Sequence, residues 1–273
     1  MPKYNLKDKV VVVTGASSGI GEAIALELAR KGAKLVIAAR NIEKLECLAS
    51  KISSDGKEVL VVPTDVSEEE DCKALIQNAV EKFGTVHALI NNAGISMRAL
   101  FKDLQLDVIR KVMNVNFWGA VYCTKYALPY LLENKGSVTG ISSIAGFKGL
   151  PARTGYSASK FALQGFLEVL RIENLKTGLH VMTACPGFTA SNIRNVALVA
   201  DGSVQGESPR NENKMMKPDK VAKKIINGIG KRKTTIIMGS QGKMLNILNK
   251  FFPQIADKAV YINLAKEIDS PFK

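Results

Sequence analysis

Short apolar runs alternate with helix-length amphipathic segments along almost the whole chain, and this alternation limits the possible folds more than any other feature. The apolar runs predict strands at residues 9–14, 34–39, 58–63, 87–92, 136–142, 179–186 and 234–239. Each run is nearly continuously apolar, which is typical of parallel strands covered by helices on both faces. The segments between them predict helices at 21–31, 42–53, 68–83, 107–132, 156–176 and 218–230. The pattern therefore predicts an α/β fold with a doubly wound parallel sheet of about seven strands.

The length of 273 residues suits one large α/β domain. A polar stretch at 200–214 predicts a mobile insertion between a strand and a helix. Beyond the last strand, apolar residues at helical spacing over 244–265 predict a C-terminal helical extension, which Pro253 divides into two helices. Four scattered cysteines form no C-x-x-C pair, so we expect small buried residues and no metal site.

The net charge of +13 is concentrated in the last sixty residues, which hold 13 basic and 4 acidic side chains. Such an excess suits an anionic membrane surface, nucleic acid or an acidic ligand, and it also suits a solubilising face. No zinc-finger, RNP or basic-zipper pattern accompanies it, so we expect no nucleic-acid partner. No apolar segment has the length of a signal peptide or a membrane span, and we therefore expect a cytoplasmic protein.

The first predicted strand leads into a glycine-rich turn, TGASSGIGEA, and the next helix. Gly15 permits the tight turn, while Gly19 and Gly21 let a pyrophosphate approach the backbone and the helix N-terminus. A glycine-rich turn alone is a weak signal, but its place between a strand and a helix is the context that makes dinucleotide binding credible. The turn predicts a Rossmann-like fold.

The second strand ends at Arg40, where a carboxylate would favour NAD through the ribose hydroxyls. The Arg40 guanidinium instead suits a 2′-phosphate, so the sequence favours NADP(H). The alternative is a surface arginine that opens the next helix. After the third strand, Asp65 is placed to meet the adenine amino group, although it could equally cap the following helix, as could Ser67.

The segment YSASK places Tyr156 and Lys160 four residues apart on one face of a predicted helix. An ammonium beside a phenol stabilises the phenolate and lowers a pKa that starts near ~10. This pair would make a general acid or base that works near neutral pH. For a lone pair with this spacing, a surface tyrosine stacked on a lysine stem is the better interpretation.

Taken in order, these motifs resemble those of the short-chain dehydrogenase/reductases over about residues 7–266. The resemblance includes the glycine turn, NNAG at 91–94, Ser143, YSASK and Pro186-Gly187. The segments NNAGISMRALF, PGFTASNI and ADGS are similar to those of hydroxysteroid dehydrogenases and of the relatives called member 7 of that family. The resemblance implies a single domain with a cofactor and catalytic core at 7–186, a substrate loop at 187–217 and C-terminal helices at 240–268.

In such an enzyme Tyr156 transfers the proton, Lys160 assists it and holds the nicotinamide ribose, Ser143 bonds the substrate oxygen, and Asn116 holds a relay water. The neighbours Ser142 and Asn114 match the pattern less well, and we expect structural roles for them. Asn91 and Asn92 are expected to be polar supports for the strand-to-loop turn. The implied cofactor-binding residues are Gly15, Ser17, Ser18, Gly19, Ile20, Gly21, Arg40, Asp65, Val66, Asn92, Ala93, Gly94, Tyr156, Lys160, Pro186, Gly187 and Ser191.

The implied activity is an NADP(H)-dependent oxidoreductase, acting on CH–OH donors, that interconverts a carbonyl and a secondary alcohol on a hydrophobic, steroid-, retinoid- or lipid-like substrate. The alternative is a scaffold that senses NADP(H) and acts through a protein partner. We expect a homodimer or homotetramer. Most of the apolar C-terminal residues are expected to pack on the core, at least one of Phe251 and Phe252 included. Alternatively, this segment forms a lid over the substrate or rests on an anionic membrane.

Overall fold

A single parallel sheet of seven strands, in the order β3-β2-β1-β4-β5-β6-β7, organises the computed structural model, which describes residues 4–272. The strands are β1 (Val10–Thr14), β2 (Lys34–Ala39), β3 (Val59–Pro63), β4 (Ala88–Asn91), β5 (Ser137–Ile141), β6 (His180–Cys185) and β7 (Thr235–Ile237). Each of the seven predicted strands is present and differs at its ends by at most two residues. The predicted α/β doubly wound fold is confirmed.

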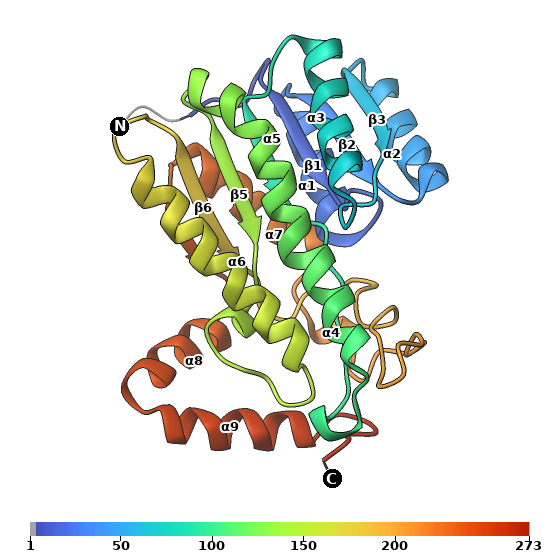
Figure 1. Ribbon diagram of the computed structural model, residues 1–273, viewed down its shortest axis with the longest axis vertical. Helices are drawn as coiled ribbons and strands as arrows, with labels where there is room; N and C mark the ends of the chain where they lie inside the picture. Colours follow the sequence, from blue (N-terminus) through green and yellow to red (C-terminus); the bar gives the residue numbers. More distant parts are fainter. Residues whose placement is uncertain (1–3, 273) are drawn as a thin grey trace.

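Helices cover both faces of the sheet (Figure 1). One layer contains α1 (Gly19–Arg30), α2 (Ile42–Ser54) and α7 (Pro218–Gly230), and the other contains α3 (Glu69–Phe83), α5 (Gly119–Glu133) and α6 (Thr154–Glu173). Alternate residues of a strand face opposite layers, so Val11 and Val13 join the first core while Val10 and Val12 join the second. Every residue of β1, the four valines and Thr14, is therefore buried, as the continuous apolar run indicated.

The long helix predicted at 107–132 is interrupted. It consists of α4 (Leu106–Met113), a π-helical turn at Asn114–Trp118 and α5. A π turn inserts one extra residue into the helical ladder and often marks a functional position. Here it contains Asn116, whose side chain is turned into the protein and is 1% exposed.

Beyond the carboxyl ends of the strands lie α8 (Ser240–Phe251) and α9 (Pro253–Ala265), near the N-terminal end of α6 (Figure 1). The break at Pro253 is confirmed. The expectation that most apolar residues of this extension pack on the core is wrong. Phe251 and Phe252 are 64% and 58% exposed. Only Val260 is buried among the ten residues whose spacing suggested the packing: Met244, Leu245, Ile247, Leu248, Phe251, Phe252, Ile255, Ala259, Val260 and Ile262. Periodicity identified helices with an apolar face, but most of that face has no cover within the chain.

Residues 200–214, expected to be a mobile insertion, are tied to the rest of the protein by ion pairs. Arg210 pairs with Glu267, and Glu212 pairs with Arg194. Three cysteines are buried as expected, but Cys47 is exposed on α2. Across residues 4–272, no helix is both long enough and apolar enough to cross a bilayer.

Candidate active site

The sheet order reverses at β1, which lies between β2 and β4, and the loops that follow the strands diverge there. In a doubly wound sheet such a switch point opens a crevice at the carboxyl ends of the strands. A cavity of about 420 Å³ lies here, lined by the segments that follow β1 to β6. It reaches from Arg40, after β2, to Ser191, after β6. Every predicted site residue lines this cavity except Gly21 and Asn116, which lie behind its wall.

The glycine turn forms one end of the cavity. Gly15 has a φ of +65°, and a Cβ at this position would lie 2.7 Å from the Cα of Ala93. Gly21 has ordinary helical geometry, but a Cβ there would lie only 2.2 Å from the carbonyl oxygen of Gly15. Asn92 fixes the turn, because its Nδ2 donates to the carbonyl oxygens of Thr14 at 2.9 Å and Gly15 at 3.1 Å. The backbone therefore forms a shallow cradle that larger residues would fill, which fits a pyrophosphate at the start of α1.

Arg40 and Asp65 face each other across the adjacent part of the cavity, with 3.7 Å between Arg40 Nη1 and Asp65 Oδ2. The Arg40 side chain is 70% exposed, so it is free to turn toward a ligand. Asp65 does not cap the following helix, because its Oδ1 accepts hydrogen bonds only from the backbone and hydroxyl of Ser67. The following helix begins at Glu69, with Glu68 rather than Ser67 as its N-cap.

At the other end of the cavity, Tyr156 and Lys160 lie on the first turns of α6 and Ser143 follows β5. Ser143 lies beside Tyr156 and favours its phenolate form, and Lys160 Nζ lies 5.7 Å from the centre of the tyrosine ring. The lysine ammonium is buried and donates to the carbonyl oxygen of Ile141 at 2.9 Å. The structure thus brings together a hydroxyl, a phenol and an ammonium that the sequence placed on two elements.

The electrostatics of this cluster differ from the expectation that Lys160 lowers the pKa of Tyr156. Burial raises the pKa of Tyr156, and the neighbouring Ser143 hydroxyl and the positive charges of Arg153 and Arg194 oppose this rise only in part. Burial also lowers the pKa of Lys160 itself, to about 8. The phenol is therefore protonated at neutral pH, as a proton donor must be.

Asn116 is held in one orientation by three partners. Its Oδ1 accepts from the Ile95 amide at 2.8 Å, and its Nδ2 donates to the Ile95 carbonyl and the Ser159 hydroxyl, both at 2.9 Å. A Cβ on Gly94 would lie 3.1 Å from Asn116 Oδ1 and 3.4 Å from Lys160 Nζ, so the asparagine and the lysine flank the same backbone position. Ser142, expected to be structural, bonds to Gln164 and the backbone of Lys160.

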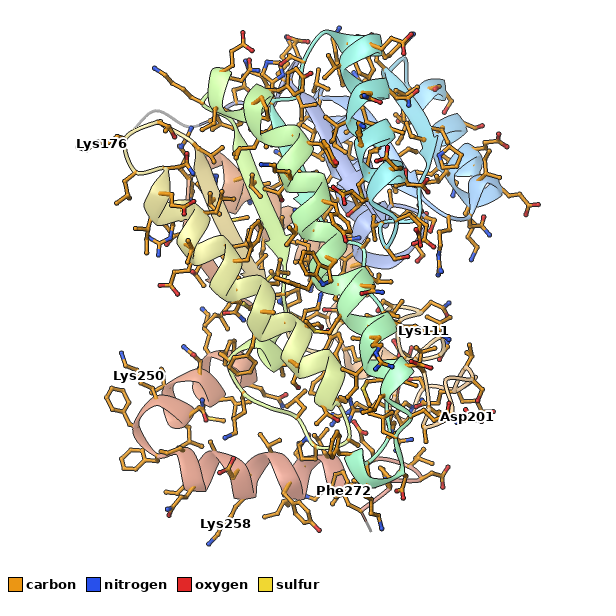
Figure 2. The ribbon with its side chains drawn as sticks, in the orientation of Figure 1. Lys111, Lys176, Asp201, Lys250, Lys258 and Phe272 are labelled. Carbon is orange, nitrogen blue, oxygen red and sulfur yellow. The ribbon has the colours of Figure 1, made fainter. Side chains whose placement is uncertain are left out.

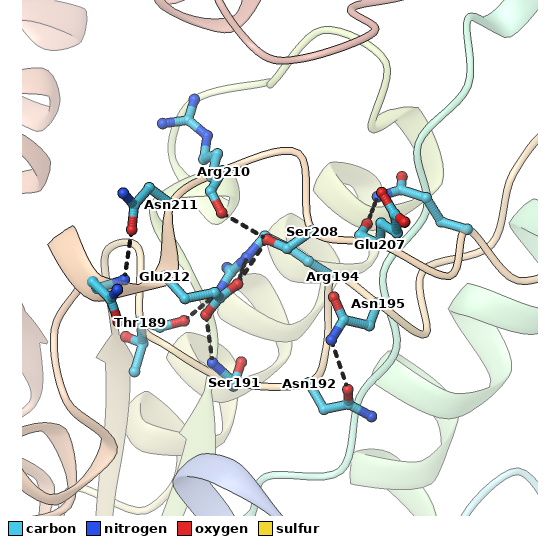
Figure 3. Close-up of polar contacts among 12 residues, drawn as sticks. Thr189, Ser191, Asn192, Arg194, Asn195, Glu207, Ser208, Arg210, Asn211 and Glu212 are labelled. Carbon is cyan, nitrogen blue, oxygen red and sulfur yellow. Dashed lines mark hydrogen bonds and ion pairs between the residues drawn. The ribbon is translucent and has the colours of Figure 1, made fainter.

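The loop after β6 closes the cavity opposite the glycine turn. Ser191 lies within 3.2 Å of the position that a Cβ on Gly19 would occupy. Figure 3 shows that Glu212 holds this loop, because its carboxylate accepts from the Ser191 amide and from the Arg194 guanidinium. Arg194 also donates to the carbonyl oxygen of Thr189 at 2.6 Å. The loop is consequently a compact wall with an internal ion pair.

Sequence reasoning missed three charged residues that line the cavity, namely Arg153, Arg194 and Glu267. Arg153 lies three residues before Tyr156, so it falls on the adjoining turn of the chain and could have been considered. Nothing in the local sequence indicates Glu267, which reaches the cavity from beyond α9. The remaining wall on this side is mostly apolar, with contributions from Ile144, Leu150, Phe188, Ile193 and Val196.

Comparison with known proteins gives a consistent result. The family model described as short chain dehydrogenase matches residues 9–199. An 11-beta-hydroxysteroid dehydrogenase-like 2 protein of Arabidopsis thaliana is 37% identical over 93% of this chain and 80% of that protein. Dehydrogenase/reductase SDR family member 7B of Mus musculus is 39% identical over 86% of this chain and 75% of that protein.

Solved structures agree with this result. A short-chain dehydrogenase/reductase of Burkholderia phymatum in complex with NAD is similar, with a TM-score of 0.83 and 25% identity over 92% of this chain and 96% of that one. An alcohol dehydrogenase of Thermococcus sibiricus complexed with 5-hydroxy-NADP has a TM-score of 0.74 and 26% identity over 84% of this chain and 95% of that one.

Proposed function

The chain belongs to the short-chain dehydrogenase family, and we propose that it is an NADP(H)-dependent oxidoreductase that interconverts a carbonyl and a secondary alcohol on a hydrophobic substrate. The observation that carries this proposal is the meeting of Ser143, Tyr156 and Lys160 on one cavity with the glycine cradle. A nicotinamide cofactor seated on the cradle supplies or accepts the hydride. One continuous cavity extends from Arg40 to Tyr156, as a dinucleotide site requires.

The protein residues are proposed to manage the proton. In the reductive direction the Ser143 hydroxyl donates a hydrogen bond to the substrate oxygen, and Tyr156 gives its proton to the same oxygen as negative charge develops there. The charges of Arg153 and Arg194 then favour the phenolate that remains. Lys160 is proposed to hold the nicotinamide ribose, and Asn116 a relay water that returns a proton to the site. In the oxidative direction the tyrosine removes the hydroxyl proton.

The proposed preference for NADP(H) depends on Arg40. Its guanidinium is the cation at the adenosine end of the cavity, and its weak 3.7 Å contact with Asp65 leaves most of its donors available for a phosphate. Asp65 lies close enough to oppose an additional negative charge, so the two residues act in opposite directions. We therefore propose that Arg40 outweighs Asp65 because it is the longer and more exposed side chain.

The proposed substrate is hydrophobic, because Ile144, Leu150, Phe188 and Val196 line the tyrosine end of the cavity. A scan of steroid-, retinoid- and lipid-like carbonyl compounds, in which NADPH consumption is monitored by its absorbance, tests activity and substrate class together. Turnover of one or more apolar ketones or aldehydes is expected. Cofactor binding without turnover on any carbonyl or alcohol would favour the other candidate, an NADP(H)-sensing scaffold that acts through a protein partner.

We also propose that the enzyme is cytoplasmic and touches membranes at its periphery, through the outer face of α8 and α9. This face is apolar and basic, with exposed Met244, Ile247, Phe251, Phe252, Ile255 and Ile262 beside Lys243, Lys250, Lys258 and Lys266. Asp257 is the single acidic residue from Ser240 to Ala265. Figure 2 shows Lys250 and Lys258 projecting outward from the two helices. An anionic bilayer would neutralise the lysines and cover the apolar side chains, whereas a second copy would bring like charges together.

Binding to sedimented vesicles tests this contact. Vesicles with anionic phosphatidylglycerol are expected to retain the protein at low salt, and pure phosphatidylcholine vesicles are not. Phe251→Ser should weaken retention, while Ile42→Ser, at an exposed site on the distant α2, should not. If the retained fraction changes neither with salt nor with either substitution, the proposed membrane-binding surface is contradicted.

For the homodimer or homotetramer, exposed Trp118, Phe161, Val169 and Ile172 on the π turn and α6 offer a separate apolar surface.

A further inference from the structure

Glu267 is a buried carboxylate, 4% exposed, in the segment that follows α9. Three guanidiniums from separate parts of the chain converge on it. Arg153 donates to both of its oxygens at 2.9 and 3.2 Å, Arg210 donates at 2.5 Å, and Arg98 Nε lies 3.5 Å away. Burial of this kind is rare for a carboxylate and requires partners such as these, because a lone buried charge is strongly unfavourable. Glu267 also lines the active-site cavity.

The turn that Glu267 holds is strained. Ala152, directly before Arg153, has a φ of +59°, a left-handed conformation that side chains with a Cβ seldom adopt. Arg153 is the N-cap residue of α6, and its carbonyl oxygen accepts from the Ser157 amide at 2.8 Å. Its guanidinium also donates to the carbonyl oxygen of Pro151 at 3.2 Å, which closes the turn on itself. The Arg153–Glu267 contact therefore fixes the point at which the tyrosine-bearing helix begins.

The C-terminal extension also buries the tyrosine. Tyr156 packs against two apolar clusters, one of which includes Leu150 together with Val260 and Leu264 of α9. The other cluster lies on the α4 side of the ring and includes Met97 and Val108. Burial is the largest influence on the pKa of Tyr156. The positions of α9 and of Glu267, just beyond it, thus affect how far the Tyr156 phenol is shielded from solvent.

We infer that Glu267 is a positioning residue for the reaction: through Arg153 it clamps the C-terminal segment onto the start of α6, and so sets the place and burial of Tyr156. This inference rests on the proposed oxidoreductase function for its kinetic consequences but not for its structural ones. The clamp spans the chain, since Arg153 and Glu267 are 114 residues apart. It joins the catalytic helix to an extension that otherwise exposes much of its apolar surface.

A matched control lies on the same extension. Asp257 of α9 pairs with Lys148 at 2.5 Å and thus also ties the C-terminal helices to the segment before α6, but it is 67% exposed and does not line the active-site cavity. Glu267→Gln and Asp257→Asn each replace one carboxylate by an amide of the same shape. If the extension acts only as a structural brace, the two variants should have similar effects.

The kinetic test compares these variants on the best carbonyl substrate. Glu267→Gln is expected to lower kcat at least tenfold and leave the KM for NADPH near that of the wild type. Glu267→Asp, which keeps the charge on a shorter stem, should recover part of the loss, and Asp257→Asn should retain wild-type kcat. Equal kinetics in Glu267→Gln and Asp257→Asn would overturn the inference. If Glu267→Gln does not fold, Glu267→Asp and Arg153→Lys replace it, with the same expected direction and the same control.

The pH profile separates positioning from general destabilisation. Reduction needs protonated Tyr156, so turnover falls as the pH rises through the pKa of the phenol. Loss of the Glu267 charge leaves Arg153 unbalanced and favours the phenolate, so the alkaline limb should move to lower pH. The groups that face Tyr156 are Ser143, Arg153, Lys160, Cys185 and Arg194. An alkaline limb at the wild-type pH in Glu267→Gln would contradict the inference.

Hydrogen exchange tests the clamp without any substrate. In Glu267→Gln the amides of residues 152–157 should exchange faster than in the wild type and in Asp257→Asn. Unchanged exchange there would overturn the clamp even if activity were lost. If the wild type reduces no carbonyl at all, the proposed function fails, and the exchange comparison alone decides whether Glu267 holds the start of α6.

Discussion

Among the glycines of the turn, Gly21 is the position where replacement by alanine should disturb the cofactor cradle most. The added Cβ would lie 2.2 Å from the carbonyl oxygen of Gly15 and 2.5 Å from Asn92 Nδ2, whereas ordinary contacts are 3.4–4 Å. Both neighbours must move by roughly 1 Å, and overpacking of this kind costs about 1–3 kcal/mol. Asn92 holds the turn through its bonds to Thr14 and Gly15, and loss of one would add about 1 kcal/mol.

The control is Gly165→Ala, on the outward face of α6, where a Cβ would meet no atom of this chain within 4 Å. In a helix this change alone should stabilise by about 0.5–1 kcal/mol. Gly21→Ala gains the same helical term, so its net loss of unfolding free energy should be about 1–3 kcal/mol. At about 2–4 °C per kcal/mol for a chain of this size, the Tm should fall by roughly 2–12 °C.

Thermal unfolding and NADPH fluorescence titration, performed on both variants, give the comparison. A displacement of the turn that removes one or two backbone contacts to the pyrophosphate should raise the Kd for NADPH about tenfold or more, since 1.4 kcal/mol corresponds to a factor of ten. Gly165→Ala should bind NADPH as the wild type does. Wild-type affinity in Gly21→Ala would refute the assignment of this turn to the cofactor.

Three further outcomes are expected. Arg40→Asp should weaken NADPH binding by about one to two powers of ten, the value of a charge-assisted contact of ~1.5–3 kcal/mol. If the Kd values for NADPH and for NADH are the same in the variant as in the wild type, Arg40 has no role in cofactor choice. Lys160→Met should abolish turnover yet stabilise the protein: the folded pKa of about 8 lies below the ordinary 10.5, so the penalty for the buried ammonium is fully present below about pH 8 and disappears as the pH rises toward 10.5. At ~1.4 kcal/mol per pKa unit the gain at pH 7 should be on the order of 1–3 kcal/mol by urea unfolding, and a loss of stability would show that the ammonium is better solvated than its burial implies. Phe251→Ala and Phe252→Ala should each change the unfolding free energy by about 0.5 kcal/mol or less, as for exposed sites, because a buried phenylalanine would instead cost about 3–5 kcal/mol.

The sheet and most of the site could be predicted because their signals are local. Each strand is a short run that must be buried on both faces, so its apolar residues are contiguous, and β2 begins and ends at the predicted residues. The glycine turn and the Tyr156–Lys160 pair are likewise contained in a few consecutive positions. Parallel strands then bring the segments after their carboxyl ends to one edge of the sheet, which is why residues as distant as Gly15 and Ser191 line the same cavity.

The rest depends on contacts between distant parts of the chain. The clamp joins Arg153 to Glu267, and neither residue differs locally from a solvated surface charge. The π turn around Asn116 inserts one residue into an otherwise regular helical pattern, so periodicity predicts one continuous helix. For α8, spacing identifies an apolar face but does not say whether this chain covers it, and Phe251 shows that it does not.

Tyr156 is the proposed proton donor of a carbonyl reduction. Tyr156→Phe retains the ring and its packing against α9 while it removes the hydroxyl, so the most direct measurement is kcat of this variant on the best carbonyl substrate at saturating NADPH. General acid–base catalysis contributes about 10²–10⁴-fold, and kcat is expected to fall by at least that factor while the Kd for NADPH stays within about twofold, a free-energy change of about 0.4 kcal/mol. Near-normal kcat with intact NADPH binding would contradict the proposed mechanism.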